Sequence, residues 1–312
     1  MSLAAALAVP AGARAEDLLS HKRPVDLIAS TGNLYWTYHD TEEGGASIWR
    51  ASKDTSPGEE RLLYQETGNV FLFGSLVFAN VSGSWFGYFL AHYQDASGGG
   101  TSYLKRIPLA GGAAVTLALS PAYGRGGDLV TDGVNLYWSD SGGLRRMPIG
   151  GGAVITMFSG PLVRQVGLDP GFVYFSDGGT VKRMPKTGFL VTTQATNTNF
   201  ITSLYVHVSG STTTLYFGDT GGAVRSKRVG DSNNVTHQVS TAGRRVNSVG
   251  FDGTRVMWTE CAKPDGNECR VRKKEWFGKV TVASGGVGSD NLQWDSGHMY
   301  WGEGSGLKKY TH

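Results

Sequence analysis

The amino-acid sequence predicts an all-β fold made of repeated four-stranded antiparallel units. One motif, LYWSDSGGLRRMPIG at residues 136–150, returns almost unchanged as VYFSDGGTVKRMPKTG at residues 173–188. Weaker copies lie upstream and downstream, giving seven in all, and successive copies are 37 to 53 residues apart. Glycine contributes 46 of the 312 residues, whereas proline contributes only 10. A period near 40 residues combined with many tight turns is typical of a β-propeller.

Each copy predicts the same order of elements. A short apolar segment such as 128–131 predicts the first strand, and an Asp-Gly pair such as 132–133 predicts the turn that follows. The aromatic segment predicts the second strand, a segment with basic residues the third, and a short segment such as 153–157 the fourth. The first aromatic residues of the copies are Tyr35, Tyr88, Tyr137, Tyr174, Tyr216 and Tyr300, with Met257 as the exception in the sixth copy. Four antiparallel strands form one blade, so we expect seven blades, or six if the copy around Tyr88 is an insertion.

The two ends of the repeat region predict how the ring closes. The last copy stops at Tyr310, after its third strand, and has no fourth strand of its own. The segment 16–20 would supply this strand from the N-terminal side and so remove the free sheet edge. We therefore expect residues 16–312 to form a single propeller domain.

The N-terminal segment and the two cysteines predict an exported protein. Residues 3–15 (LAAALAVPAGARA) are apolar and end in an A-x-A pattern, so we interpret residues 1–15 as an export-signal remnant, or otherwise a disordered tail. Cys261 and Cys269 flank a Pro-Asp-Gly turn sequence. If the flanking strands form a hairpin, the two thiols would face each other, and a disulfide suits a secreted or periplasmic location.

The repeated motif also resembles a known class of propellers. The LYWSD…LRRMP copies are similar to the YWTD repeats of the low-density-lipoprotein-receptor propellers, and to bacterial YWTD-like and lyase-like propellers. The similarity extends over nearly the whole chain through short motifs. It implies the propeller fold and favours a binding function, and it implies that the acidic residue of the motif is structural.

Two sets of repeated residues are predicted to build the scaffold. The acidic residues of the motif would pair with basic residues of the third strand; the expected pairs are Asp140–Arg145, Asp177–Lys182, Asp219–Arg225, Glu260–Arg272 and Glu303–Lys308. The second aromatic position would pack blade against blade; its residues are Trp36, Phe89, Trp138, Phe175, Phe217, Trp258 and Trp301.

Departures from the repeat point to a binding surface. The connections 38–47, 91–102 and 260–270 between second and third strands are long, and they belong to neighbouring parts of the ring. They lie on the face where the first strands begin, together with the channel mouth, whose arginines would suit an anionic ligand. The candidate ligand-binding residues are Tyr38, His39, Asp40, His92, Tyr93, Asp95, Arg125, Arg164, Arg245 and Asn291. Surface variation without function explains long loops equally well.

Charge and motifs limit the function classes. The net charge of +3 is spread over all repeats, which argues against a nucleic-acid partner, and no apolar stretch is long enough for a spanning helix. No catalytic motif is present, so we assign no catalytic residue and no cofactor. The sequence favours a module that binds a protein, a glycan or a small ligand. The alternatives are a lyase or lactonase-like enzyme using His39, His92 or axial carboxylates with calcium or magnesium, and a structural assembly subunit.

Overall fold

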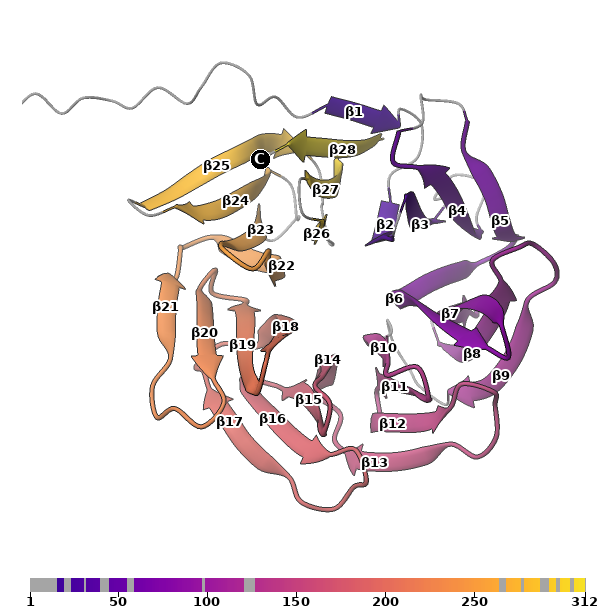
Figure 1. Cartoon of the computed structure of the whole chain (residues 1–312), viewed down its shortest axis with the longest axis horizontal. Coiled ribbons are helices and arrows are strands. Elements are labelled where there is room, and N and C mark those ends of the chain that lie inside the picture. Colours follow the sequence, from indigo (N-terminus) through magenta and orange to yellow (C-terminus); the bar gives the residue numbers. More distant parts are fainter. Residues whose placement is uncertain are drawn as a thin grey trace, which may run out of the picture.

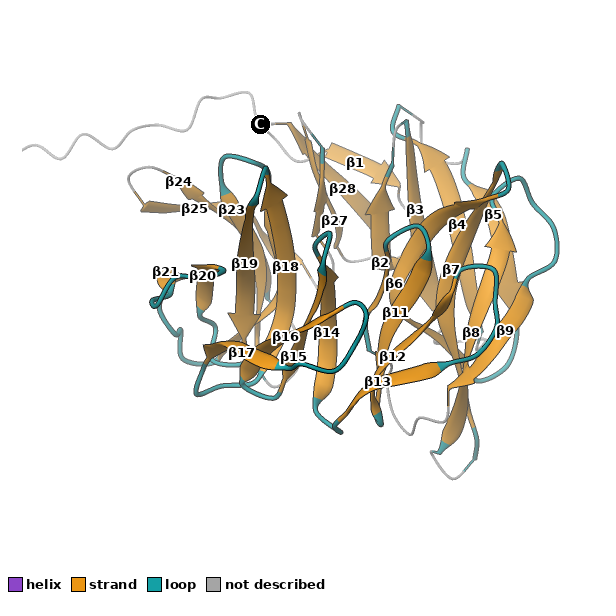
Figure 2. Cartoon of the chain, turned by 60° about the horizontal axis from the view of Figure 1, so that its bottom comes forward, coloured by secondary structure: helices purple, strands orange, loops and turns teal. Residues whose placement is uncertain are grey.

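The computed structural model describes residues 16–19, 24–30, 32–39, 45–54, 59–96, 99–120, 127–263, 268–275, 278–286, 292–295, 298–303 and 306–311. Every regular element in these ranges is a β-strand (Figure 2). The strands form seven four-stranded antiparallel sheets arranged in a ring, which confirms the predicted seven-bladed β-propeller (Figure 1). The described ranges contain no helix long and apolar enough to cross a membrane.

The strands of each blade follow one another along the chain. Blades 1 and 2 contain β2 (Pro24–Ala29), β3 (Asn33–His39), β4 (Ala46–Ser52), β5 (Arg61–Glu66), β6 (Val70–Val81), β7 (Ser84–Gln94), β8 (Gly100–Pro108) and β9 (Val115–Ser120). Blades 3 and 4 contain β10 (Leu129–Thr131), β11 (Asn135–Asp140), β12 (Gly143–Pro148), β13 (Ile155–Ser159), β14 (Val163–Leu168), β15 (Phe172–Asp177), β16 (Thr180–Pro185) and β17 (Thr192–Thr196). Blades 5 and 6 contain β18 (Ile201–Ser209), β19 (Thr212–Asp219), β20 (Val224–Arg228), β21 (Val235–Gln238), β22 (Arg244–Phe251), β23 (Val256–Ala262), β24 (Cys269–Glu275) and β25 (Gly278–Gly286). Blade 7 contains β26 (Leu292–Trp294), β27 (His298–Glu303), β28 (Gly306–Thr311) and β1 (Glu16–Leu19).

Each blade runs from the central axis to the rim. The first strand of each blade lies nearest the axis and the fourth lies outermost (Figure 1). We call the end of the ring where the first strands begin the loop face, and the end where first and second strands are joined the turn face. The copy around Tyr88 forms the complete blade β6–β9 and is not an insertion, which settles the number of blades at seven.

Blade 7 is closed by the N-terminal strand, as predicted. β1 pairs with β28 in an antiparallel ladder that places Glu16 opposite Lys309 and Asp17 opposite Lys308. β1 flanks β28 at the outer side of the ring (Figure 1). The first and last described strands therefore belong to one sheet, and the outer edge of β28 is paired.

Neighbouring blades are joined by a repeated hydrogen bond near the axis. In four blades, the polar residue just before the first-strand residue that pairs with the packing aromatic accepts a hydrogen bond from a backbone N–H of the next blade. The acceptors and donors are Asp26 Oδ2 and Leu76 N (2.6 Å), Asp128 Oδ2 and Val166 N (3.1 Å), Ser203 Oγ and Val249 N (2.8 Å), and Ser248 Oγ and Leu292 N (3.3 Å). The donor residue occupies the same position in its own blade each time, so these bonds align adjacent first strands along the axis.

Aromatic side chains fill the space between blades. All seven predicted packing aromatics are buried, with at most 1% of their surface exposed. Trp138, for example, packs with Tyr88 and Leu90 of the preceding blade in one apolar cluster. The interpretation of these rings as core rather than as an exposed binding platform is confirmed.

The predicted pairs between the acidic motif residue and the third strand are confirmed where the structure describes them. The closest nitrogen–oxygen distances are 3.0 Å for Arg145–Asp140, 2.5 Å for Lys182–Asp177, 2.9 Å for Arg225–Asp219 and 3.0 Å for Arg272–Glu260. The Glu303 side chain lies outside the described part of the structure. The carboxylates are nearly buried in three of these pairs, so each needs its partner and is scaffold rather than a free ligand.

A second polar contact recurs on the turn face. Tyr174 donates a hydrogen bond to Asp169 (2.6 Å), and Thr213 of the next blade donates to the same carboxylate (3.0 Å). Tyr137 and Asp132 repeat the arrangement, with Lys186 of the next blade as the outside partner. Burial, together with the hydrogen bond to Asp169, raises the pKa of Tyr174 to about 12.

Truncating a packing aromatic should cost much of the stability. Trp138→Ala leaves a cavity between blades 2 and 3, so we expect the free energy of unfolding to fall by about 3–5 kcal/mol in urea denaturation. Trp85 is 57% exposed, so the matched change Trp85→Ala should cost less than about 1 kcal/mol. Equal losses for the two variants would contradict the described packing.

The turn-face tyrosines should make stability fall at high pH. An unfolded tyrosine loses its proton near pH 10.0, whereas folded Tyr174 keeps it to about pH 12. Folding therefore binds a proton in this interval, so the free energy of unfolding should decrease between those two pH values. Tyr174→Phe should reduce this slope by roughly 1 kcal/mol per pH unit. The equivalent Tyr137→Phe should behave alike, and an unchanged slope in both variants would refute the assignment.

Candidate functional site

The loop face carries the longest connections between second and third strands. The connections in blades 1, 2 and 6 span residues 40–45, 95–99 and 263–268, whereas those in blades 3, 4 and 7 contain two residues each. The sequence analysis located the long loops correctly but made them too long. The strands continue further than expected, because β7 runs to Gln94 and β8 already begins at Gly100.

This extension moves His92 from a predicted loop tip into the scaffold. His92 lies inside β7, is 5% exposed, and shares a hydrogen bond of 2.9 Å between its Nδ1 and the Ser102 hydroxyl of β8. Burial lowers the pKa of His92, and the nearby Asp95 carboxylate acts in the opposite direction. A buried, hydrogen-bonded imidazole offers little surface to a ligand. The expectation that His92 occupies a loop is wrong, whereas Asp95 is exposed after the strand end.

Tyr93 also lies in β7, in a polar network between blades 1 and 2. Its hydroxyl donates to Glu66 of β5, and Lys105 of β8 contacts both the Tyr93 hydroxyl and the Glu66 carboxylate, the latter at 2.8 Å. Tyr64 donates to the same carboxylate. Burial acts to lower the pKa of Lys105, but hydrogen bonds to Glu66 and Tyr93 outweigh it and leave that pKa raised. Ala91 stands where most blades have the acidic motif residue, so Lys105 takes its partner from blade 1 instead.

In blade 1, Tyr38 and His39 end the strand β3. The His39 ring packs on Phe71 of β6, with the ring centroids 4.1 Å apart. Phe71 is paired with His92 across the β6–β7 ladder, so both imidazoles lie along the seam between blades 1 and 2. Asp40 lies outside the described residues.

Two of the predicted channel-mouth residues, Arg164 and Arg245, belong to the described part of the structure. Arg164 is exposed, and its backbone carbonyl accepts hydrogen bonds from the Ser139 hydroxyl and the Asp128 backbone N–H. Arg245 is half-buried, and its Nε is buried without a hydrogen-bond partner among the described residues. Arg125 and Asn291 lie outside the described ranges.

A cavity of about 710 Å³ occupies the centre of the ring. Its lining comes from the first strands of all seven blades and the residues next to them. The polar lining residues are Asp26, Asp128, Thr131, Gln165, Ser203, Asn247, Ser248 and Gln293. No Lys, Arg or His belongs to the lining that the structure describes. None of the described residues that the sequence analysis named as ligand-binding candidates belongs to this lining, and Arg164 and Arg245 are among those that do not.

Sequence reasoning missed the two aromatic residues of the cavity, Tyr205 and Trp294. They lie on first strands, whereas the repeated aromatic motif lies on second strands. Other first strands also carry aromatic residues, such as Phe78 of β6 and Phe251 of β22, so an aromatic residue in a first strand does not by itself mark the cavity.

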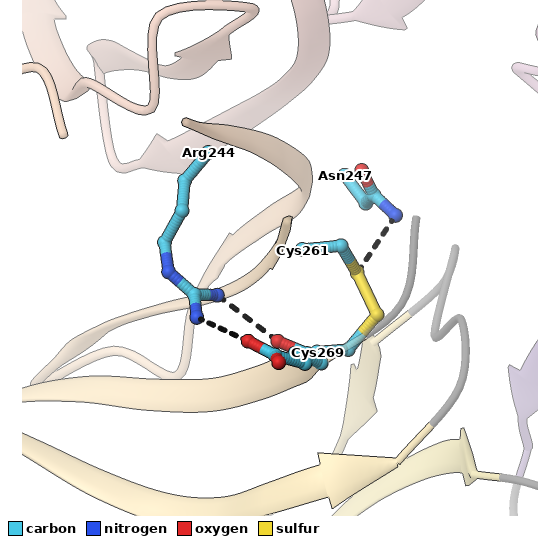
Figure 3. The surroundings of a disulfide bond; sticks show 5 residues. Arg244, Asn247, Cys261 and Cys269 are labelled. Carbon is cyan, nitrogen blue, oxygen red and sulfur yellow. Dashed lines mark hydrogen bonds and ion pairs between the residues drawn. A yellow bond between two sulfur atoms is a disulfide. The ribbon is translucent and has the colours of Figure 1, made fainter. Parts of the chain in front are cut away.

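The predicted disulfide between Cys261 and Cys269 is present, at the base of the blade 6 loop (Figure 3). The loop base is held from a second side by Arg244, whose guanidinium donates to the Glu268 carbonyl at 3.0 Å. The Asn247 amide points at the disulfide, with its nitrogen 3.3 Å from the Cys261 sulfur, and Asn247 also lines the cavity (Figure 3). The clamped loop and the central cavity are therefore neighbours.

The described part of the chain contains no cluster of side chains arranged to bind a metal ion. No group of three or more His, Cys, Asp or Glu side chains comes together there.

Comparison with solved structures supports the fold. A chain of the mitotic checkpoint complex is 13% identical, with a TM-score of 0.64 over 100% of this chain and 99% of that one. The WD40 β-propeller domain of Doa1 is 14% identical, with a TM-score of 0.68 over 97% of both chains. A puromycin-hydrolysing peptidase of Mycobacterium tuberculosis is 12% identical, with a TM-score of 0.63 over 90% of this chain and 50% of that one. No family model matches the sequence, and no curated protein does. At these identities the likeness establishes a seven-bladed β-propeller fold and nothing finer.

The free energy of unfolding should distinguish buried His92 from exposed Asp95 in blade 2. His92→Ala removes a buried ring and leaves the Ser102 hydroxyl without its partner, so we expect a loss of about 1–3 kcal/mol. Asp95→Ala, three residues away on an exposed position, should change the free energy of unfolding by less than about 0.5 kcal/mol. Chemical denaturation near neutral pH measures both. Indistinguishable values would mean that His92 contributes little to the packing of β7.

Proposed function

We propose that this protein is an exported β-propeller that binds a protein partner through its loop face. The disulfide supports an oxidising compartment, since such bonds persist in secreted and periplasmic proteins. The repeats further suggest a YWTD-like propeller, a class that resembles this chain in its second and third strands.

The observation that carries the proposal is the clamped loop base of blade 6. Cys261 and Cys269 join the two strands covalently, and the buried Arg244 guanidinium holds the Glu268 carbonyl from the adjacent strand. Lys263 N–H donates to the Gly243 carbonyl on the other side of the loop. Fixing the two ends of a loop reduces the conformational entropy that is lost when a partner binds, which favours affinity.

The clamped segment presents charge to the solvent. Lys263 is exposed, and the Glu268 side chain is 78% exposed although the backbone beside it is fixed. Asp95 adds an exposed carboxylate on the same face from blade 2. The Glu268 carboxylate also lies 3.8 Å from the Arg244 guanidinium. Exposed charges beside a fixed backbone suit the rim of a protein interface, where electrostatic complementarity selects the partner.

Two solved structures of the same fold agree with such a role. One of them is a chain of the mitotic checkpoint complex, which is an assembly of proteins. The extracellular domain of a putative one-component system, BT4673 of B. thetaiotaomicron, is 11% identical with a TM-score of 0.59, and it covers 93% of this chain and 40% of that one. Propellers host unrelated functions, so these likenesses support the proposal without identifying the partner.

Affinity capture from the extracellular fraction of the source organism tests the proposal. The double charge reversal Lys263→Glu with Glu268→Lys should abolish retention of any specific partner, because it inverts the surface at the clamped loop. The control Asp231→Lys reverses an exposed charge in blade 5, outside the loop face, and should retain the partner. Reduction of the disulfide should weaken retention as well. A partner held equally by all three proteins, or none retained by the wild type, would refute the loop-face proposal.

A further inference from the structure

The central cavity has a composition that the loop face does not share. Its volume of about 710 Å³ falls within the range of small-molecule sites in proteins. Apolar walls contributed by residues such as Val130, Leu168 and Val206 alternate with amide, hydroxyl and carboxylate groups. The lining belongs to first strands that are aligned by hydrogen bonds between blades, so the site is preformed.

Two aromatic residues line this cavity and also pack against the apolar core between blades. Tyr205 and Trp294 contact each other edge to face, with their centroids 5.0 Å apart and an interplanar angle of 78°. They come from blades 5 and 7, so Trp294 reaches across the first strand of blade 6 to make the contact. Gly250 permits this, because a Cβ at that position would overlap the Trp294 ring. The absence of a side chain at Gly250 in blade 6 therefore makes space for the Trp294 indole of blade 7 at the cavity wall.

Amide side chains supply the polar part of the wall. Gln165, Asn247 and Gln293 line the cavity from blades 4, 6 and 7. A carboxamide offers two N–H donors and one carbonyl acceptor, so it can satisfy a hydroxyl group that both donates and accepts. Three such groups around one cavity suit a ligand with several hydroxyls.

The cavity favours an uncharged ligand. No basic side chain lines its described part, so an anion would lose hydration without gaining a charged partner. The two carboxylates, of Asp26 and Asp128, already accept backbone N–H groups at both oxygens. They hold neighbouring blades together, so backbone donors of the scaffold already stabilise their charge and they do not require a cationic ligand.

We propose that the central cavity binds a neutral mono- or disaccharide. The C–H face of a sugar ring packs on the faces of aromatic side chains, which carry partial negative charge, and its hydroxyls pair with the amides. The site is separate from the partner surface at the clamped loop, and sugar binding requires no partner protein.

Titration of the full-length protein with defined sugars tests the inference. The probes are glucose, galactose, mannose, N-acetylglucosamine, maltose, cellobiose and trehalose, followed by tryptophan fluorescence and isothermal calorimetry. Glucuronate and glucosamine serve as charged analogues of glucose with nearly the same shape. We expect saturable binding of at least one neutral sugar and weaker binding of its charged analogues.

Substitutions of lining residues test whether the sugar binds in the cavity. Gln165→Leu removes one lining amide at similar size and should weaken binding roughly tenfold. Gln194→Leu is the matched control, since Gln194 lies on the outer strand β17 of the same blade and should leave affinity unchanged. Trp294→Leu should weaken sugar binding further. Its matched control is Trp85→Leu, at an exposed position away from the cavity. If Trp294→Leu fails to fold, the affinity of Gln165→Leu alone tests the inference.

Three results would overturn the inference. These are no saturable binding of any neutral sugar of the panel, equal or tighter binding of the charged analogues, and unchanged affinity in Gln165→Leu. Failure here leaves the loop-face proposal intact, because that proposal is read out by partner capture and not by sugar binding.

Discussion

The hydrogen bond from one innermost strand to the next blade is the contact that sets the geometry of the ring. Apolar packing between blades is strong but has little direction, so aromatic rings alone would allow adjacent sheets to slide along the axis. A carboxylate or hydroxyl such as that of Asp128 or Ser203, bonded to one particular backbone N–H of its neighbour, fixes that position. The turn-face contacts of Asp132 and Asp169 repeat the restraint at the other end of the blade. The blades are therefore aligned at both ends, with the aromatic core between.

This alignment separates the residues that build the ring from the residues that are available to bind. Polar groups at recurring positions of the repeat, such as Asp219 and Glu260, form ion pairs within the scaffold. Groups that break the repeat occur in the central cavity and in the loops of the loop face. Tyr205 and Trp294 occupy the first place, and Lys263 and Glu268 the second. Function and scaffold can thus vary separately in this fold.

Much of the fold could be predicted because it is periodic, whereas the candidate site is not. The blade number, the closing strand, the packing aromatics and the Cys261–Cys269 bond follow from repeated patterns or local pairing. His92 was misplaced because strand length in blade 2 depends on packing against blade 1, which a single sequence does not display. Arg164 lies beside a β-bulge in the β14–β15 pairing, where side chains do not follow strict alternation, so its direction could not be predicted from the sequence. Tyr205 and Trp294 meet only in three dimensions, across Gly250.

The composite seventh blade has a consequence for how the chain folds. Blades 1 to 6 each consist of consecutive strands, so their pairing is local and can form as soon as each segment is available. Blade 7 requires β1 to find β28 at the far end of the described chain, and the entropy of closing so large a loop opposes this encounter. Closure is therefore the step of highest contact order and the natural bottleneck of folding. Once made, it joins the first and last described strands in a single sheet and covers the outer edge of β28.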